Sequence, residues 1–276
     1  MLSLHTNAAS LSTQNSLGST NKALGSSMTK LGTGLRVNSA MDDAAGLQIA
    51  TRLNAQTRGM QVAQKNTQNG ISMLQTAEGA LKELDSILQR MKDLATDGAN
   101  ATSSTSADLP AMAAEFKALT AEMKNIVDNT TFGGQNLLSA TGAFKNGNTV
   151  TFQIGATAAE NYEFSTTKEL KLTETDLGTL DTNANANAAI TKVNTAIETV
   201  GSLRSELGAG ANRLEHTYNN LGNMIQNTSA AKGRIMDVDY ATETSNMTSK
   251  QMLMQASTSM LKQSNSMSQM VASLLQ

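Results

Sequence analysis

Residues 240–276 read YATETSNMTSKQMLMQASTSMLKQSNSMSQMVASLLQ, and this stretch decides the fold. Large apolar residues recur in it every seven positions, at Leu253, Met260, Met267 and Leu274. A second column stands beside the first and consists of Met254, Leu261 and Leu275. On a helix this spacing predicts a narrow apolar stripe along one side. Because one helix cannot bury such a stripe alone, it requires a partner helix, either from this chain or from another copy.

The beginning of the chain carries a similar stripe. It is formed by Leu24, Met28, Leu31 and Leu35. Their separations of four, three and four residues are those of a heptad seam. The first acidic residue of the chain is Asp42, and no acidic residue follows Glu243. We therefore expect the two acid-free terminal helices to pair with each other. The alternative for the isolated chain is a loose, serine-rich N-terminal tail.

A long helix is predicted after the N-terminal stripe. Ser39 followed by Asp42 reads as a capping box that starts a helix. From there a heptad frame persists through residues 46–95. A helix of that length spans about 75 Å, so the pattern predicts a rod and not a globule.

Two further helices are expected to lie along this rod. The first begins near Asp108 and Pro110, because proline is tolerated in the first turn of a helix. The second begins near Asn187 and carries a seam of alternating four- and three-residue steps from Val193 to Thr228. Arg204 is the one residue within this seam that breaks its apolar character.

Residues 139–188 differ from the rest of the chain. Short runs of alternating apolar residues replace the helical spacing, and a turn signal stands at residues 146–148 (NGN). The pattern predicts half-buried strands arranged as hairpins. The alternating positions are Val150, Phe152 and Ile154, then Tyr162 and Phe164, then Leu170 and Leu172.

Composition excludes several functional classes. One proline and an aromatic content of 3% favour long helices over a compact core. A net charge of −2 does not indicate nucleic-acid binding. No apolar run reaches the length of a transmembrane helix, and the absence of cysteine removes thiol chemistry. His5 and His216 have no ligand partner at a helix-face spacing. We expect no catalytic, metal-binding or cofactor-binding residues and no enzymatic activity.

Several longer motifs identify a family. Near the N-terminus, residues 34–40 read GLRVNSA and residues 42–50 read DDAAGLQIA. Residues 129–138 read NTTFGGQNLL, and residues 237–247 read DVDYATETSNM. These sequences closely resemble the signatures of bacterial flagellins, over nearly the whole chain and most strongly in residues 1–95 and 200–276. Ser268 stands where many relatives have proline, so a straighter helix is expected there.

The resemblance implies a mainly α fold. It consists of a long antiparallel helical rod or coiled coil built from both halves of the chain, with a small β-hairpin region in the middle. The terminal helices would pair as an inner coiled coil. The expected domains are residues 1–40 and 236–276 for the inner helical core, residues 41–138 and 189–235 for the rod, and residues 139–188 for a minimal outer surface.

The resemblance also implies the function of a structural subunit that polymerises into the bacterial flagellar filament for swimming or swarming motility. Such a subunit is secreted and lies outside the cell. The alternatives are a hook–filament junction protein and an unrelated coiled-coil interaction module. We expect the polymerisation core to consist of Leu24, Met28, Leu31, Leu35, Leu253, Met260, Leu261, Met267, Leu274 and Leu275.

Further partners follow from the same resemblance. Besides copies of itself, the chain is expected to meet a flagellar export chaperone, a cap protein and hook-associated proteins, and neither nucleic acid nor a membrane. Residues 89–95 (QRMKDLA) resemble the segment that a host Toll-like receptor recognises on many flagellins. The contact residues there would be Gln89, Arg90 and Leu94, with Glu115 on the next helix. The alternative for Arg90 and Glu115 is an ordinary ion pair on the rod.

Overall fold

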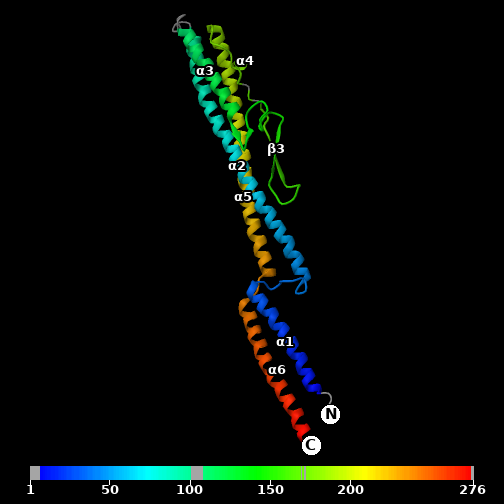
Figure 1. Cartoon of the computed structure of the whole chain (residues 1–276). Coiled ribbons are helices and arrows are strands. Elements are labelled where there is room, and N and C mark those ends of the chain that lie inside the picture. The colour runs from blue at the N-terminus through cyan, green and yellow to red at the C-terminus, as the bar shows by residue number, and fades with distance from the viewer. Residues whose placement is uncertain (1–6, 101–107, 169, 171, 275–276) are drawn as a thin grey trace. The chain divides into compact units, whose positions relative to one another are not determined.

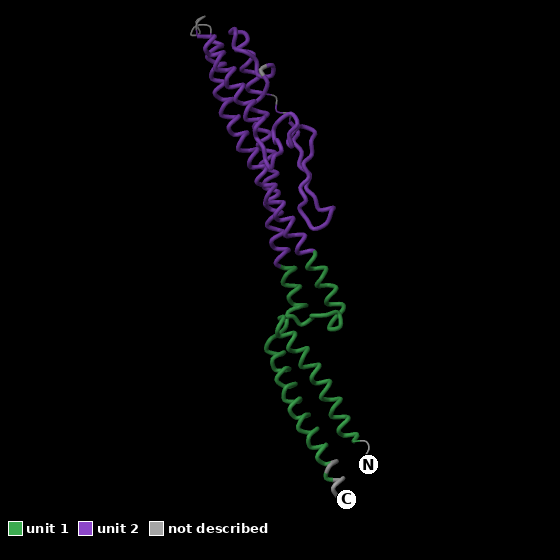
Figure 2. The backbone as a smooth tube through the Cα atoms, in the orientation of Figure 1, with its two compact units in different colours: residues 1–55, 227–276 green, residues 56–226 purple. Residues whose placement is uncertain are grey.

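The computed structural model describes residues 7–100, 108–168, 170 and 172–274, without the side chains of residues 174, 268, 269 and 271–274 (Figure 1). The chain divides into two compact units (Figure 2). Unit 1 comprises Met1–Ala55 and Asn227–Gln276, and unit 2 comprises Gln56–Gln226. Each unit therefore has its own set of packed helices, and the two sets are described separately.

Unit 1 is built on two helices from the two ends of the chain. Helix α1 (Ala8–Thr33) and helix α6 (Tyr240–Leu274) lie side by side in Figure 1. They run antiparallel, because Asn7 donates to the carbonyl of Ser264 at 3.2 Å while Leu35 bridges Asp237 at the opposite end. The expected pairing of the terminal helices is confirmed.

The contact between α1 and α6 is a seam of mostly small and apolar side chains, with one lysine among them. On α1, Leu24 and Ser27 are buried, with Leu17, Thr20 and Leu31 half-buried beside them. On α6 the half-buried positions recur at steps of three and four residues: Met247, Lys250, Met254, Ser257, Leu261 and Ser264. Such steps keep one face of a helix on its partner. The seam thus repeats along the described length of both helices, with few large side chains.

Backbone hydrogen bonds join the segment after α1 to the segment before α6. Gly34 ends α1 in the left-handed conformation with φ 73°, and its N–H donates to the carbonyl of Lys30 at 2.9 Å. Val238 N–H then donates to the carbonyl of Gly34 at 3.0 Å, and Arg36 N–H to that of Met236 at 2.6 Å. These bonds tie the two segments that follow α1 and precede α6.

The first residue of the long helix differs from the prediction. Helix α2 (Ala44–Ala99) begins after Asp43, whose carboxylate accepts from the N–H of Gly46 at 2.8 Å. Asp43 is therefore the N-cap, and the prediction that Ser39 caps the helix is wrong. Asp42 instead accepts from the N–H groups of Ser39 and Asn38 in the preceding turn, which lowers its pKa.

Unit 2 is formed mainly by helix α2, helix α3 (Asp108–Asn129) and helix α5 (Asn183–Met236). Helix α5 starts earlier than the expected Asn187. Contacts pair Gly98 with Ala186, Asp85 with Arg204, and Gly70 with Leu214, so α2 and α5 run antiparallel. The heptad frame of α2 has two columns, and both are buried from Met60 onward, as the spacing predicts. The buried members are Met60, Thr67, Leu74, Leu81, Leu88 and Ala95 in one column, and Ala63, Gly70, Ala77, Leu84 and Met91 in the other.

The seam of α5 also lies where the sequence places it. Val193, Val200, Leu207 and Leu214 are at most 2% exposed. Arg204 sits among them, and its guanidinium lies 3.7 Å from the carboxylate of Asp85 on α2. The Nε atom of Arg204 is buried and has no hydrogen-bond partner among the described residues. The polar interruption seen in the sequence is thus a half-buried ion pair between the two long helices.

The middle of the chain contains two small antiparallel sheets. Strand β1 (Thr131–Phe132) pairs with β2 (Gln135–Asn136) around a turn at Gly133 and Gly134. This pairing of two strands was not predicted. Strand β3 (Thr149–Gln153) pairs with β4 (Asn161–Ser165), as the alternating residues predict. Leu170 and Leu172 are not in a described strand; Leu172 precedes the short helix α4 (Glu174–Leu177) and is buried.

Aromatic rings attach the β3–β4 hairpin to the helices. Phe144 and Phe164 meet edge to face at 5.4 Å, and Arg213 lies 4.5 Å above the ring of Tyr162. Gly210 on α5 provides the room for this contact, because a Cβ there would lie 2.9 Å from the ring of Phe164. The hairpin is therefore part of the core of unit 2.

Candidate assembly surface

An apolar surface on α6 remains uncovered within the chain. We call it the outer stripe; its members are Met252, Leu253, Met260 and Met267. Their exposed fractions are 60%, 48%, 64% and 49%. At about 100° per residue, the stripe lies about 110° around the helix from the seam that faces α1. Helix α6 therefore has two apolar faces, of which α1 covers one.

The surroundings of the outer stripe are uncharged. On the helical wheel Ser249, Ala256 and Gln263 fall in the same sector as the stripe. The only cations of α6, Lys250 and Lys262, fall outside that sector. Its one acidic residue in the first turn is Glu243, far from Met260 along the helix. Large exposed apolar side chains without neighbouring charge are typical of protein–protein contact surfaces.

The residues predicted for the polymerisation core fall into two groups. Leu24 is buried, and Leu31, Leu35 and Leu261 are half-buried within unit 1. Four others are exposed: Met28, Leu253, Met260 and Met267. The side chain of Leu274 and the whole of Leu275 lie outside the described residues. The structure thus separates positions that hold α1 to α6 from positions that face outward. Met252 was missed, because no seven-residue repeat marks it.

The four residues predicted to contact a receptor do not form one surface. Arg90 on α2 donates through Nε and a terminal nitrogen to Glu115 on α3, at 2.9 and 2.7 Å. This hydrogen bond and the charge of Glu115 raise the pKa of Arg90. Gln89 is exposed and donates to Asp85, whereas Leu94 is buried at 5% exposure. Arg90 and Glu115 therefore form the ion pair that the sequence left as an alternative.

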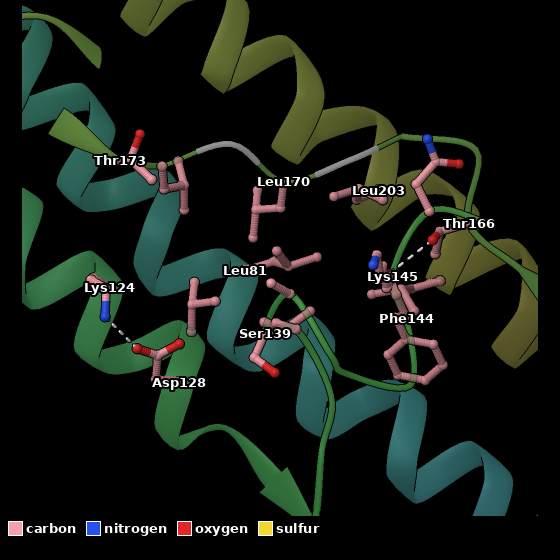
Figure 3. Close-up of a pocket in the computed structure, with 16 residues that line it drawn as sticks. Leu81, Lys124, Asp128, Ser139, Phe144, Lys145, Thr166, Leu170, Thr173 and Leu203 are labelled. Carbon is pink, nitrogen blue, oxygen red and sulfur yellow. Dashed lines mark hydrogen bonds and ion pairs between the residues drawn. The ribbon is translucent and has the colours of Figure 1, made fainter. Parts of the chain in front are cut away.

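A cavity of about 170 Å³ lies in unit 2 between α2, α3, α5 and the central loops (Figure 3). Its wall is apolar, with Leu81, Phe144 and Leu203 among the lining side chains, and Lys124 and Lys145 also line it. Lys124 donates to Asp128 at 2.8 Å, and the bond raises the pKa of Lys124.

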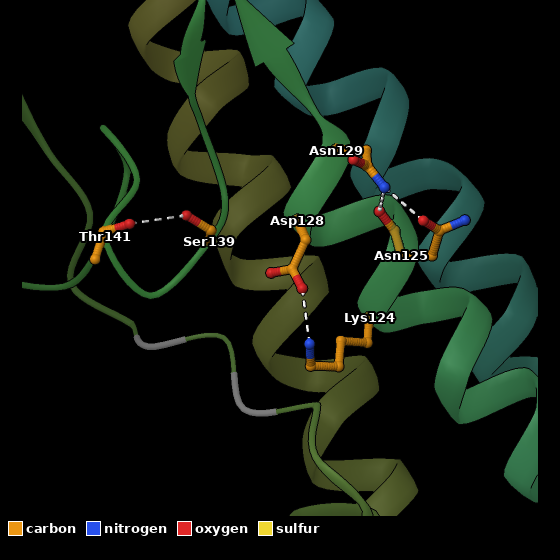
Figure 4. Close-up of polar contacts among 6 residues, drawn as sticks. All are labelled: Lys124, Asn125, Asp128, Asn129, Ser139 and Thr141. Atoms are coloured by element: carbon orange, nitrogen blue, oxygen red, sulfur yellow. Dashed lines mark hydrogen bonds and ion pairs between the residues drawn. The ribbon is translucent and has the colours of Figure 1, made fainter.

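Figure 4 shows polar contacts among six residues, of which Lys124, Asp128 and Ser139 line this cavity. The hydroxyl of Ser139 is 3.4 Å from that of Thr141, and Asn129 donates to Asn125. Across the described part of the chain, no group of three or more acidic or histidine side chains could hold a metal ion. Nor is any described helix long and apolar enough to cross a membrane.

The terminal helices pair with each other, unit 2 has a heptad core, and an apolar stripe remains uncovered. These features define a coiled-coil structural protein. Two family models match the sequence: the bacterial flagellin N-terminal helical region over residues 4–143, and the bacterial flagellin C-terminal helical region over residues 190–275. The chain therefore belongs to the bacterial flagellin family and is a structural subunit of the flagellar filament, outside the cell.

Individual relatives agree with this assignment. The chain is 41% identical to a flagellin of Halalkalibacterium halodurans over 275 residues, covering 99% of each chain. It is 41% identical to a flagellin of Bacillus subtilis over 303 residues, again covering 99% of each. A flagellar filament 33 kDa core protein of Treponema phagedenis is 36% identical, with 99% of both chains covered. These matches do not favour a hook–filament junction protein or an unrelated coiled coil.

A solved structure also resembles the fold. The crystal structure of Bacillus cereus flagellin superimposes with a TM-score of 0.51 at 32% identity, covering 57% of this chain and 88% of that one. The mainly helical fold expected from the sequence is confirmed.

Proposed function

We propose that the chain polymerises into the filament through unit 1, with the outer stripe of α6 and Met28 of α1 packed against neighbouring copies. The observation that carries this proposal is the exposure of five large apolar side chains on α6, the four of the outer stripe and Met270, beside a seam that α1 already fills. A second copy can cover such a stripe without charge repulsion, because no charged residue falls in its sector.

Burial of the outer stripe contributes measurably to the free energy of association between subunits. Covering a large apolar side chain contributes about 1.5 to 3 kcal/mol when it passes from full exposure to full burial. The stripe residues are already about half covered by their own helix, so each contributes about 1 kcal/mol. Contacts of this kind do not close on themselves when the two surfaces differ, and they then generate an open helical polymer. Repetition along that polymer adds the small contributions of many copies.

The remaining parts of the chain take roles within this scheme. Residues 1–40 and 236–276 supply the inner core, residues 41–138 and 189–235 the rod, and residues 139–188 the outer surface. An export chaperone that covers α6, a cap protein and hook-associated proteins are the partners that such a subunit requires. The absence of cysteine and the single proline, Pro110, favour passage as an unfolded chain, since disulfide formation and proline isomerisation are slow.

A truncation and a substitution test the assembly surface. Removal of residues 241–276 should leave a soluble protein that does not polymerise, because both the seam partner and the stripe are lost. Met260→Glu should also prevent filament growth while leaving the helix content unchanged, since it places a charge in the stripe. Seeded growth would be followed by sedimentation and electron microscopy.

Gln255→Glu is the matched control, because Gln255 is exposed on α6 outside both the seam and the stripe. It adds the same charge and should still polymerise. Normal filaments from the truncated chain or from Met260→Glu would refute the proposal. Equal loss in Gln255→Glu would show that the stripe has no special role.

A contact with a host Toll-like receptor remains a proposal about partners. Arg90, Glu115 and Gln89 are exposed and close to one another, so they can form one contact surface. Leu94 is buried, so its contribution would be to hold α2 in place. Alanine at Arg90 should weaken binding to the receptor ectodomain in surface plasmon resonance, whereas alanine at the exposed Lys65 should not. Equal binding of both variants would contradict the proposal.

A further inference from the structure

The sulfur atoms of this chain are distributed unevenly. There is no cysteine, so all sulfur is in 16 methionines. Six of them lie on α6, at Met247, Met252, Met254, Met260, Met267 and Met270. Leucine forms helices as well as methionine does, so helix formation alone does not require this choice. The apolar surface proposed for assembly is therefore built mainly from thioether side chains.

Burial separates these methionines into two classes. In unit 2, Met60, Met91 and Met123 are at most 1% exposed. In unit 1, Met252 and Met260 are 60% and 64% exposed, and Met28 and Met267 are 53% and 49% exposed. Met41, in the loop between α1 and α2, is 97% exposed, and Met270 on α6 is 57% exposed. A dissolved oxidant can reach the second class in the folded subunit but not the first. No thiol in the chain competes for that oxidant.

The reaction at these side chains is simple. The thioether sulfur attacks a hydroperoxide, an S–O bond forms as the O–O bond breaks, and the sulfur is oxidised by two electrons. Hydrogen peroxide is reduced to water in the same step. The product, methionine sulfoxide, is polar and chiral, and it disrupts contacts that require an apolar side chain. Repair by the two methionine sulfoxide reductases returns the oxygen as water while a dithiol becomes a disulfide.

We propose that Met28, Met252, Met260 and Met267 are sites of reversible oxidation by hydroperoxides, and that their oxidation prevents the free subunit from entering the filament. This inference rests on the proposed function, because it assigns a regulation to the same surface. Oxidation at these positions leaves the fold intact, since they are outside the seam between α1 and α6. In the filament the same side chains are covered, so an assembled subunit resists oxidation that inactivates a free one.

The test starts from the purified wild-type subunit. It is treated with hydrogen peroxide, the peroxide is removed with catalase, and the oxidised positions are found by peptide mass spectrometry. The four proposed methionines should gain one oxygen each, as should the exposed Met41 and Met270, while Met60, Met91 and Met123 remain unchanged. Circular dichroism should be unaltered. In seeded growth the critical concentration should rise about fivefold for each methionine whose burial is lost, because each contributes about 1 kcal/mol. Treatment with both reductases and dithiothreitol should restore growth.

Leucine variants identify the responsible positions. One variant replaces four methionines by leucine, at Met28, Met252, Met260 and Met267. Leucine keeps the side-chain volume and the apolar character, so this variant should assemble equally before and after peroxide treatment. Met41→Leu is the control, because Met41 is 97% exposed but lies in the loop between α1 and α2. That variant should lose assembly after peroxide as the wild type does.

The possible outcomes separate a failure of this inference from a failure of the proposed function. Wild-type subunits that are oxidised at the four positions and still assemble normally would overturn this inference alone. Equal loss of assembly in the leucine variant and the wild type would do the same, by placing the sensitive site elsewhere. Untreated wild-type subunits that do not assemble would overturn the proposed function, and this inference with it. Because the wild-type and repair arms need no variant, the test stands even where the leucine variant folds poorly.

Discussion

At the scale of single residues, Gly34 is the one residue with a positive φ in the described part of unit 1. Its φ of 73° lies in the left-handed region, and a Cβ there would be 2.9 Å from the hydroxyl oxygen of Tyr240. The same residue ends α1 and accepts the hydrogen bond from Val238. Gly34 therefore allows the segment before α6 to approach the end of α1 closely.

Gly34→Ala should destabilise the α1–α6 pair by about 1 to 2 kcal/mol, because the left-handed conformation is unfavourable for alanine and Tyr240 must move. Urea unfolding followed by circular dichroism would measure it. Gly18→Ala is the control: Gly18 is exposed within α1 and nothing lies near its Cβ position. It should stabilise the helix by about 0.5 to 1 kcal/mol. A loss of stability at both positions would show that α1 tolerates no added methyl group.

Asp239 is the N-cap of α6, and it accepts from Thr242 Oγ1 at 2.6 Å and from Ala241 N–H at 3.0 Å. The bonds from Thr242 are the main cause that lowers the pKa of Asp239. Because the folded pKa lies below the unfolded one, the charged cap stabilises the helix above about pH 4, and the contribution is lost as the pH falls further.

Asp239→Asn keeps an acceptor oxygen but removes the charge. We expect it to be less stable than the wild type at pH 7 and to lose less stability than the wild type between pH 5 and pH 3. Thermal unfolding monitored at 222 nm at several pH values would show this. A wild type and variant with parallel pH dependence would exclude a role for the ionised cap.

At the scale of whole elements, spacing predicted more than local motifs did. The seam of α5 and both columns of α2 are buried where a heptad repeat places them, because burial of a helix face follows from its period. The start of α2 was misplaced, since Ser39 and Asp43 both precede the helix and either side chain can cap. The β1–β2 hairpin was not predicted, because its strands have two residues each and are too short to show an alternating pattern.

The candidate surface on α6 was only partly predictable. The sequence contains two adjacent columns, one with Met254 and Leu261 and the other with Leu253, Met260 and Met267. The repeat does not distinguish which column faces α1, since either is apolar enough to do so. The packing of α1 resolves this by covering the first column. Met252 could be assigned to the outer stripe only once the structure showed which column faces α1.

The seam of α5 contains one position that can be improved. Arg204 leaves its buried Nε without a hydrogen bond among the described residues, while Asp85 keeps a bond from Gln89 at 3.1 Å. Arg204→Leu should therefore stabilise unit 2 by about 1 kcal/mol, because an unsatisfied polar group is replaced by an apolar contact. Urea denaturation would measure the change. Arg204→Ala should destabilise, since it leaves a void; a stable alanine variant would argue against a packing role.

At the scale of the molecule, the two units differ in how much they bury. Among the described residues, unit 1 has three buried apolar side chains, at Leu24, Val37 and Ala50, whereas the remaining core lies in unit 2. Regions with few buried contacts open at a lower free energy than a packed core. Unit 1 of the isolated subunit is thus expected to open first.

Limited trypsin digestion should reveal this difference. Cleavage of the free subunit should begin at Lys250 and Lys262 on α6, and a fragment that contains most of residues 56–226 should persist. Mass spectrometry of the digest would identify the cuts. Prior cleavage at Lys82 or Lys117, in the helices of unit 2, would contradict the assignment. Assembled filaments provide the comparison, because the proposed contacts protect α6.

The tyrosines allow fluorescence measurements on the unmodified chain. There is no tryptophan, so the three tyrosines dominate the ultraviolet emission. Tyr162 is 8% exposed beneath Arg213 in unit 2, whereas Tyr240 is 57% exposed beside Gly34 in unit 1. A soluble quencher should reach Tyr240 well before Tyr162. Tyr218 is half-buried in unit 2. The emission that is quenched first therefore reports on unit 1, without a label that would itself occupy the surface under study.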